Sequence, residues 1–589
     1  MSDIASREPT AEIVKPAADN GVTSAGSDLD QFAERYWDFR CEEFPMDALI
    51  AGVIPRSELL TRDAPADHER RAAWAAQALA ELDRIPSDAL SLNETATLQL
   101  LRGELAAMID LVAHHVHLRP GIYLLGPESQ LSDWASMTTL ATADEARRYI
   151  TRVARVKDSL EDARLCLEEG YKQGFRYPRH VIERTIDFVR NQASVPVADN
   201  PFVGPLKGIA ARGGVFGTLL EEGEAVVSNI VVPAFAAYSQ FMEDRLLPTA
   251  RDTLACIDDI EGEQHYRFLI RRYTTTDMSP DEIHEIGLAE VARLSREMEL
   301  LAAEAGFEGD LDGFRHRIRT DNTQILESGE ALREAIEILS KRIDARIPEF
   351  FGRIPRVTYG VKSIPEGIAA AAPPAYAQPS PADNSSAGIH WVTSIPSKLP
   401  RYMHVPMALH EGWPGHLMHL ALIQELTDLP AFRRHGAMNY SACLEGWALY
   451  CEALGEDMGL YDSPDKRYGR LEVEMWRAAR LVVDTGLHGK GWSRAQAIDY
   501  FGKYVAMPID FIGSEVDRYI GVPGQALGYQ IGNLKFRELR ARAEREHGDG
   551  FDLRAFNDAL SSVGAVSLTV LDTAIGAWIE ARRPDAVAG

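Results

Sequence analysis

Two histidines and a glutamate in the segment His410-Glu411-Gly412-Trp413-Pro414-Gly415-His416 have the residue types of a zinc hydrolase site. Zinc binds neutral imidazole nitrogen and carboxylate oxygen, and a catalytic zinc keeps one position open for water. A glutamate next to the first ligand can take a proton from that water. The segment therefore predicts His410 and His416 as zinc ligands and Glu411 as the general base.

The spacing of the two histidines departs from the common H-E-x-x-H pattern, in which histidines four residues apart share one helix face. Here they are six residues apart, and at about 100° per residue a straight helix would point them about 240° apart. Pro414 cannot continue the helical hydrogen bonding, and Gly415 tolerates unusual backbone angles. We therefore predict a kink or bulge that brings His416 back toward His410, with His419 as the rival second ligand.

A third ligand is predicted at Glu445, inside the largely apolar segment Ser441–Tyr450. One broad class of zinc peptidases takes its third ligand from a helix after the motif, and Glu445 follows His410 by 35 residues. A buried carboxylate without a partner is costly, so a cation opposite Glu445 is the simplest explanation. A buried salt bridge is the alternative. Glu452, two turns further along the same helix face, is a candidate to support a ligand.

Polar residues nearer the C-terminus are candidates for contact with the substrate. His488, Tyr519 and Tyr529 can each donate a hydrogen bond to a tetrahedral oxyanion. Arg518 can pair with a substrate carboxylate. Either tyrosine is equally a candidate for a core aromatic residue.

Two segments before the motif are candidates for the substrate cleft. Gly388–Ser394, which includes His390, and Val357–Tyr359 have the composition of short strands. Zinc peptidases commonly hold an extended substrate against a sheet edge through main-chain hydrogen bonds. We predict Gly388–Ser394 as that edge, with a strand that only packs as the alternative. Pro373–Ser385, which includes Tyr376, is expected to form a loop over the cleft, so His390 and Tyr376 are candidate substrate-binding residues.

Composition and charge exclude some classes of partner. The chain has 589 residues, of which 46% are hydrophobic and 25% charged, and its net charge is −26. A nucleic acid or an anionic membrane would need a basic surface. Five scattered cysteines without a C-x-x-C pair predict a reduced compartment. We find no signal-peptide core and no apolar run of membrane-spanning length, and therefore predict a cytoplasmic protein.

The pattern along the chain predicts a mainly helical protein with a small β-sheet beside the motif helix. Residues 1–26 are rich in Ala, Ser, Pro and Asp and are expected to be disordered. Residues 27–350 are predicted as a helical scaffold and residues 351–589 as the catalytic region. Within a predicted helix, Glu472–Leu487, three charged residues are expected to form a structural ion-pair network: Arg477, Arg480 and Asp484.

At these residues the chain resembles the DUF885 family, a group of bacterial proteins of unknown function placed near the zincin metallopeptidases. The resemblance covers most of the chain, from about residue 30 to about residue 580. It rests on six segments: Thr274–Gly287, Pro373–Tyr376, His410–His416, Glu445–Tyr450, Trp476–Trp492 and Asp517–Gly532. It implies one intertwined unit with a mostly helical, zincin-like fold and metal-dependent hydrolysis. It implies no particular substrate.

Three functions are compatible with these residues. The first is a zinc-dependent peptidase of the gluzincin type that acts on short peptides, with His410, His416 and Glu445 as ligands and Glu411 as the base. The second keeps the metal but hydrolyses an amide bond in a small metabolite. The third is a helical binding or scaffold protein in which the six-residue spacing spoils the site. If the two imidazoles and Glu445 cannot converge to within about 2–3 Å of one point, the metal-site interpretation fails.

Overall fold

The computed structural model describes residues 24–53, 58–123, 126–369 and 372–583, which form a mainly helical protein with one small sheet. The predicted fold class is therefore confirmed. Most of the predicted disordered tail, residues 1–23, lies outside the described residues. The chain is helical from Ser24 onward, so the predicted boundary after residue 26 is too late.

Four helices open the chain: α1 (Ser24–Glu43), α2 (Pro45–Ile50), α3 (Pro65–Leu82) and α4 (Leu92–Ala113). Helix α4 starts with a capping box, in which the Glu94 N–H donates to Ser91 Oγ and the Ser91 N–H donates to Glu94 Oε2 at 2.7 Å. Reciprocal bonds of this kind satisfy N–H groups that have no partner within the helix.

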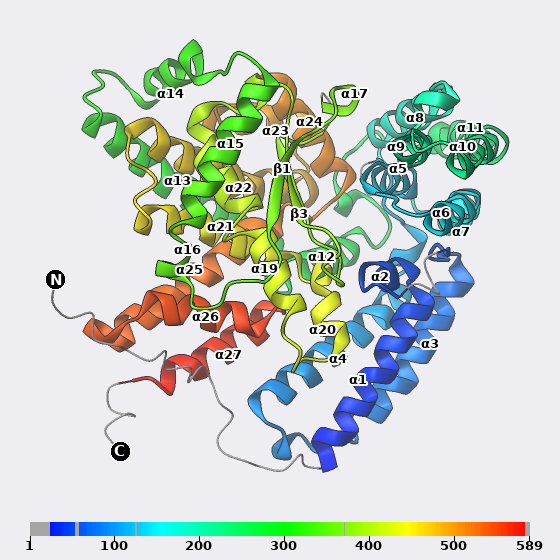
Figure 1. The fold of residues 1–589 in the computed structure, drawn as a ribbon, viewed down its shortest axis with the longest axis horizontal. Helices are drawn as coiled ribbons and strands as arrows, with labels where there is room; N and C mark the ends of the chain where they lie inside the picture. Colours follow the sequence, from blue (N-terminus) through cyan, green and yellow to red (C-terminus); the bar gives the residue numbers. More distant parts are fainter. Residues whose placement is uncertain (1–23, 54–57, 124–125, 370–371, 584–589) are drawn as a thin grey trace.

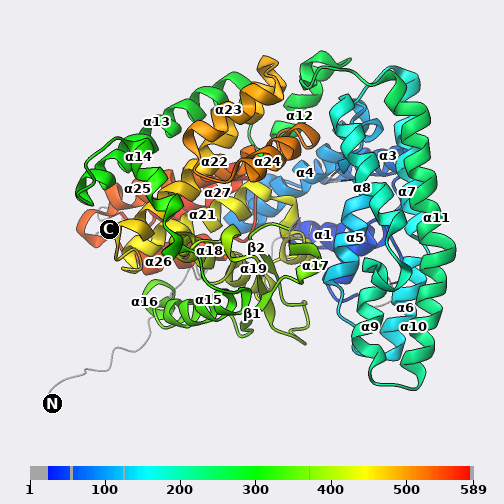
Figure 2. The same ribbon diagram turned by 90° about the horizontal axis from the view of Figure 1, so that it is seen from above.

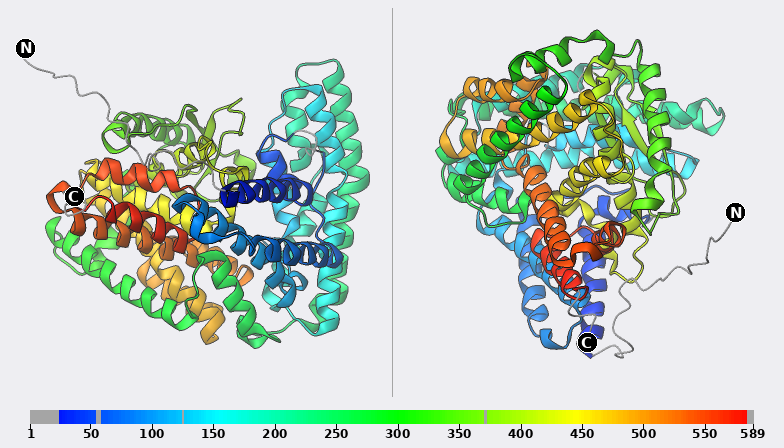
Figure 3. Two further views of the ribbon diagram at one scale, coloured as in Figure 1. Left: turned by 90° about the horizontal axis from the view of Figure 1, so that it is seen from below. Right: turned by 90° about the vertical axis from the view of Figure 1, so that its left-hand side faces the viewer.

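A second group of helices, called the arm below, lies on one side of the molecule (Figures 1 and 2). It contains α5 (Pro127–Met137), α6 (Ala143–Val153), α7 (Val156–Gln173), α8 (Arg179–Ser194), α9 (Gly204–Ala210), α10 (Val215–Val226) and α11 (Val232–Phe241). The left-hand view of Figure 3 shows the arm as a layer standing beside the other helices.

One stretch of the arm differs from the sequence expectation about membrane spans. Val215–Thr249 is helical over 35 residues and long and apolar enough, by composition alone, to cross a membrane. Its most apolar window has a mean hydropathy of 1.4, and 33% of that window is buried. A single helix of this kind is weak evidence for a span, because core helices of water-soluble proteins meet the same criterion.

The remaining helices surround the motif. Those before the sheet are α12 (Gly262–Thr274), α13 (Pro280–Glu304), α14 (Leu311–Thr320), α15 (Gly329–Asp344) and α16 (Ile347–Phe350), with α17 (Glu366–Ala369) between two strands. Those after it are α18 (His404–Glu411), α19 (His416–Gln424), α20 (Ala431–His435), α21 (Ser441–Asp457), α22 (Pro464–Lys490), α23 (Arg494–Tyr504), α24 (Ile509–Gly521), α25 (Leu527–His547), α26 (Leu553–Val563) and α27 (Leu568–Glu580).

Two clusters of buried hydrophobic residues form the core. One joins the arm to α22–α24 and includes Tyr149 and Val483. The other joins α1, α3 and α4 to the helices around the motif and includes Tyr36 and Trp447. Each cluster contains residues from both sides of residue 350, so the predicted scaffold and catalytic regions share both of them.

The sheet has three strands, β1 (Tyr359–Ser363), β2 (Ala375–Gln378) and β3 (Gly388–Val392), in the order β1-β3-β2. Strand β3 pairs parallel with β1 and antiparallel with β2. The prediction that Gly388–Ser394 is the sheet edge is therefore wrong, because both sides of β3 are already paired. The missed neighbour is β2, which forms within the segment predicted as a loop. Figure 2 shows the sheet next to α18 and α19.

Candidate metal centre

The histidine motif breaks one helix into two. Helix α18 ends at Glu411 and α19 begins at His416. Only glycine fits at Gly415, because a Cβ there would lie 2.0 Å from the His410 carbonyl oxygen. The predicted distortion at Pro414 and Gly415 is thus confirmed as a complete break. It places the rings of His410 and His416 with their centroids 4.8 Å apart.

Helix α21 contacts this break and carries Glu445, the third candidate ligand. The Trp447 indole N–H donates to the Pro414 carbonyl at 2.9 Å, and Glu445 lies two residues earlier on the same helix. Close approach of α21 and α25 requires glycine at their crossing, since a Cβ on Gly532 would lie 1.9 Å from the Ala442 carbonyl oxygen. The position of Glu445 is therefore fixed by packing from two sides.

Three ligand atoms converge. Glu445 Oε2 lies 3.4 Å from His410 Nε2 and 3.6 Å from His416 Nε2, and the set falls within 4.8 Å of one another. Three points this close all lie within about 2.8 Å of one common point. Ligands on a tetrahedral ion with bonds of about 2.0–2.2 Å would be about 3.3–3.6 Å apart. The residues His410, His416 and Glu445 are called the metal site below.

The second nitrogen of His410 is already occupied. Its Nδ1 lies 2.8 Å from Glu452 Oε1, and a carboxylate there accepts the Nδ1 hydrogen. This leaves the Nε2 lone pair directed at the metal site, as a metal-binding histidine requires. Glu452, only 2% exposed, thus occupies the supporting position predicted for it.

The electrostatics of the metal site favour a cation. Burial lowers the pKa of His410, but its contacts with Glu445 and Glu452 and the charge of Glu411 outweigh burial and raise that pKa to about 9. Burial likewise raises the pKa of Glu445, but the charge of His416 and the contact with His410 hold it well below its usual range. Without a metal, the site therefore attracts protons strongly.

A count of formal charges gives the same result. With neutral imidazoles, the three carboxylates Glu411, Glu445 and Glu452 carry three negative charges. Arg477 Nη2, at 3.9 Å from Glu452 Oε1, offsets one of them. The remaining two match a divalent ion. The donor set of two imidazoles and one carboxylate fits such an ion, and burial of these charges without one would be costly.

Glu411 is placed for the predicted role of base. It is the last residue of α18 and is 7% exposed. Within the described part of the chain, no hydrogen bond engages its carboxylate. A carboxylate next to a ligand and not held by a partner is free to accept a proton.

His419 does not join the ligands. Its ring stacks on Trp447 with centroids 4.7 Å apart, and its Nδ1 is buried without a hydrogen-bond partner in the described chain. Burial lowers the pKa of His419 to about 3, with the charge of His416 adding to the effect. Among the described residues, the second histidine of the cluster is His416, as predicted, and not its rival His419.

Of the residues predicted to donate to an oxyanion or to a substrate carboxylate, Tyr529 is the one whose hydroxyl pKa responds to the charge of Glu445. Burial raises the pKa of Tyr529, and the negative charge of Glu445 raises it further. Tyr519 is fully buried and its hydroxyl is already used, donating to Glu515 at 2.6 Å and accepting from Arg480 at 2.8 Å. Arg518 is held by both Glu515 oxygens, at 3.1 and 3.0 Å. Tyr519 and Arg518 therefore serve an internal network instead of an open cleft.

The structure does not bring His488 to the ligands. It is fully buried on α22, and its Nε2–H donates to the Tyr519 carbonyl at 2.9 Å. It lies eleven residues beyond Arg477 on this helix, which is about 16 Å along the axis. Burial lowers its pKa to about 4. A neutral, buried histidine with a main-chain partner has a packing role, not a substrate contact.

His390 and Tyr376 lie on the central and one outer strand. His390 is fully buried, and neither ring nitrogen has a partner in the described chain; burial and the charge of His410 lower its pKa to about 3. His390 is therefore a buried residue of the central strand and not an exposed residue of an open cleft. Tyr376 is partly exposed and stacks on Trp391, with centroids 6.0 Å apart.

The sequence analysis did not predict the partners of the charged residues on α22. The expected network of Arg477, Arg480 and Asp484 does not form as predicted, since Arg480 pairs with Glu515 at 3.0 Å. Asp484 instead accepts from the Tyr266 hydroxyl at 2.6 Å and from the Gly524 N–H. The helical spacing of Trp476, Arg477 and Arg480 was the available signal, because it puts them on one side of α22.

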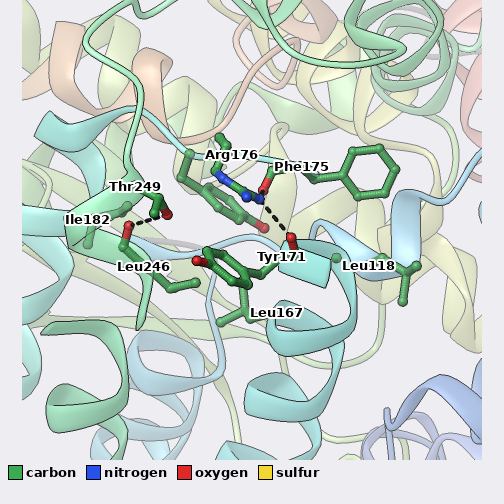
Figure 4. A pocket seen from close by; sticks show the side chains of 10 residues that line it. Leu118, Leu167, Tyr171, Phe175, Arg176, Ile182, Leu246 and Thr249 are labelled. Carbon is green, nitrogen blue, oxygen red and sulfur yellow. Dashed lines mark hydrogen bonds between the residues drawn. The ribbon is translucent and has the colours of Figure 1, made fainter. Parts of the chain in front are cut away.

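One cavity lies next to the metal site, and another lies in the arm. The cavity next to the metal site has a volume of about 120 Å³. It borders Glu452 and is lined mainly by charged side chains, including Arg470 and Glu474. Glu452 therefore contacts His410 and also borders a polar cavity. The other, in the arm, holds about 10 Å³, which is roughly one water molecule. Figure 4 shows its lining, where Arg176 donates to the Tyr171 carbonyl.

Comparison with known proteins agrees with this fold. A sequence model of the family described as "Bacterial protein of unknown function (DUF885)" matches residues 45–575. The solved "putative lipoprotein" from Colwellia psychrerythraea is 25% identical, with a TM-score of 0.87, over 95% of this chain and 100% of its own. The "putative lipoprotein of unknown function" from Shewanella oneidensis is 17% identical, with a TM-score of 0.67, over 92% and 98%.

More distant likenesses carry no weight. The carboxypeptidase of Pyrococcus furiosus is 11% identical over 88% of this chain and 97% of its own, with a TM-score of 0.26. No curated protein sequence matches the chain. The match over residues 45–575 covers most of its length, and the chain accordingly belongs to the DUF885 family of bacterial proteins of unknown function.

Proposed function

We propose that this protein is a zinc-dependent peptidase that cleaves short peptides. The observation that supports the proposal most directly is the convergence of His410 Nε2, His416 Nε2 and Glu445 Oε2 within 4.8 Å. The Glu452 contact that fixes the tautomer of His410 adds to it. Two histidines and one glutamate are the ligand set that a catalytic zinc uses with one position left for water.

In this proposal the chain supplies the base and the orientation. A bound zinc would contribute Lewis acidity, which lowers the pKa of a water and polarises the peptide carbonyl. Glu411 accepts the proton of the attacking water and returns it to the leaving amine. Tyr529, beside Glu445, donates to the oxygen on which charge develops. Glu452 keeps His410 oriented throughout.

Burial supports a small substrate. The side chains of His410, His416 and Glu445 are 4%, 13% and 19% exposed. A folded protein surface cannot reach atoms this deep, whereas an extended peptide can. Short peptides or unfolded segments are therefore the favoured substrates.

The proposal is tested by digestion of a mixed peptide library, followed by mass spectrometry of the products. Zinc-loaded protein should cleave, chelated protein should not, and added zinc should restore cleavage. Glu411→Gln should reduce kcat by about 10²- to 10⁴-fold while zinc stays bound. Glu456→Gln, an exposed change on α21, is the matched control. Cleavage that survives both chelation and Glu411→Gln would overturn the mechanism, and a zinc-loaded protein that cleaves no peptide would overturn the peptidase assignment.

A further inference from the structure

Three hydrogen-bond donors on one side of α22 lack acceptors. They are Trp476 Nε1, Arg477 Nε and Arg480 Nη1, and each atom is buried with no partner in the described chain. The residues are 6%, 3% and 4% exposed. Buried donors are normally paired, because an unpaired one costs about 1–3 kcal/mol. Three such donors within about one turn of α22 favour an acceptor close to this part of the helix.

The charges around Arg480 also lack one anion. Glu515 accepts from Arg480 at 3.0 Å and from Arg518 at 3.0 Å, so one carboxylate serves two guanidinium groups. The Arg480 guanidinium is further enclosed by the rings of Trp476 and Tyr529, at 4.4 and 4.5 Å from its Cζ. Aromatic faces attract the cation but supply no acceptor for its N–H groups. Within the described ranges, these two arginines therefore share one carboxylate as their ion-pair partner.

This cluster adjoins the metal site. Arg477 Nη2 lies 3.9 Å from the same Glu452 oxygen that accepts from His410 Nδ1. On its other side, the Arg480 guanidinium lies over the Tyr529 ring, 4.5 Å from Cζ to the ring centroid. The cluster is thus one side chain, Glu452, away from the candidate ligand His410.

We propose that Trp476, Arg477 and Arg480 form a subsite for the terminal carboxylate of the substrate, so that the protein removes residues from the C-terminus of peptides. This inference rests on the proposed peptidase function and names its substrate class. A carboxylate brings one negative charge and two acceptor oxygens, and the planar guanidinium fork is suited to it. Arg518 was the residue predicted to bind a substrate carboxylate, but two of its donors already bind Glu515. We therefore assign this role to Arg480, which shares Glu515 with Arg518 and has an unpaired Nη1.

The subsite can be tested without catalysis, on chelated protein. The probes are dansyl-labelled trialanine with a free C-terminus and the same peptide as a C-terminal amide, with fluorescence anisotropy as the readout. We expect the free carboxylate to bind roughly tenfold or more tightly, the usual effect of a charged hydrogen-bonded partner. Equal affinity of the two peptides would overturn the proposal.

Trp476→Phe removes one donor and keeps an aromatic ring, so the fold should persist. It should reduce the carboxylate preference several-fold, whereas Trp578→Phe should leave it unchanged. Trp578 is a matched control, 8% exposed and 4.7 Å from an arginine Cζ, but on α27. If folded Trp476→Phe protein prefers the free carboxylate over the amide as strongly as wild type does, Trp476 does not belong to the subsite. Arg480→Lys, which keeps the charge and loses the unpaired Nη1, should also weaken the preference, and an unchanged preference there would overturn the assignment.

Competition identifies the anion and separates this inference from the proposed function. Acetate should displace the labelled peptide, and stronger displacement by inorganic phosphate would overturn the carboxylate assignment. Products from zinc-loaded protein should be free amino acids or short C-terminal fragments. A carboxylate preference without any cleavage would refute the peptidase and leave an anion site. Internal cleavage without that preference would refute the subsite alone.

Discussion

His410 connects the metal site to the helix behind it. One ring nitrogen faces Glu445 and the other contacts Glu452, so ligand and support are coupled through a single imidazole. Glu452 in turn faces Arg477 and a polar cavity. A change at Glu452 should therefore act on the metal without touching it.

Glu452→Gln should weaken zinc binding by about 10- to 100-fold, because a neutral amide supports the basicity of the ligand less well than a carboxylate. The affinity is measured by competition with a zinc chelator. Glu456→Gln, one turn further along α21 and exposed, should leave the affinity unchanged. Equal zinc affinity in wild type and Glu452→Gln would show that the contact does not support the ligand.

Asp484 predicts a dependence of stability on pH. Burial raises its pKa from 3.8 to about 7, against the hydrogen bonds from Tyr266 and Gly524. Between these values the folded state holds a proton that the unfolded state has lost, so stability falls as pH rises from about 4 to about 7. Asp484→Asn removes this contribution.

The free energy of unfolding of wild type and Asp484→Asn should be compared in urea at pH 5, 6, 7 and 8. The difference in favour of the variant should grow by about 2–3 kcal/mol from pH 5 to pH 8 and level off above the folded pKa of about 7. Groups that titrate in both proteins cancel in this comparison. A difference that stays constant from pH 5 to pH 8 would contradict the raised pKa.

At the scale of elements, the site depends on a helix break and a helix crossing. The break between α18 and α19 replaces the single turn that separates the histidines in the common motif. The close crossing of α21 and α25 fixes the position of α21, the helix that carries Glu445. Both need glycine for close approach of backbones, at Gly415 and at Gly532 facing Gly446.

Gly532→Ala should destabilise the protein by about 1–3 kcal/mol, because the new methyl group would lie 1.9 Å from the Ala442 carbonyl oxygen. It should also weaken zinc binding, since α21 must shift. Gly103→Ala is the control, because its Cβ would meet nothing within 4 Å and should stabilise α4 by up to about 1 kcal/mol. Denaturant unfolding measures both changes, and equal stability of the two variants would contradict the tight crossing.

The two candidate histidine ligands could be predicted from the sequence because their types and spacing are local, and Glu445 could be predicted because it is a carboxylate in a largely apolar segment. Pro414 and Gly415 likewise predict the break through their own backbone preferences. The strand order was not predictable, since it depends on β2 inserting beside β3 from a segment with loop-like composition. His488, Tyr519 and Arg518 have suitable chemistry, but their partners come from other elements. Unpaired donors such as Trp476 Nε1 become visible only when the surrounding acceptors are known.

At the scale of the whole molecule, the arm and the early helices each share a buried core with later helices of the chain. The five cysteines are buried thiols. The cytoplasmic location itself stays a prediction. The family model matches residues 45–575, which include the arm, the sheet and the candidate metal site.

The most direct test of the central claim is the metal content of the purified protein, measured by elemental mass spectrometry. We predict close to one zinc per chain in wild type, and its loss in His410→Ala and Glu445→Ala. His419→Ala should keep the zinc, because this histidine stacks on Trp447 away from the ligands. Folded wild-type protein that binds no metal after zinc is supplied would contradict the account.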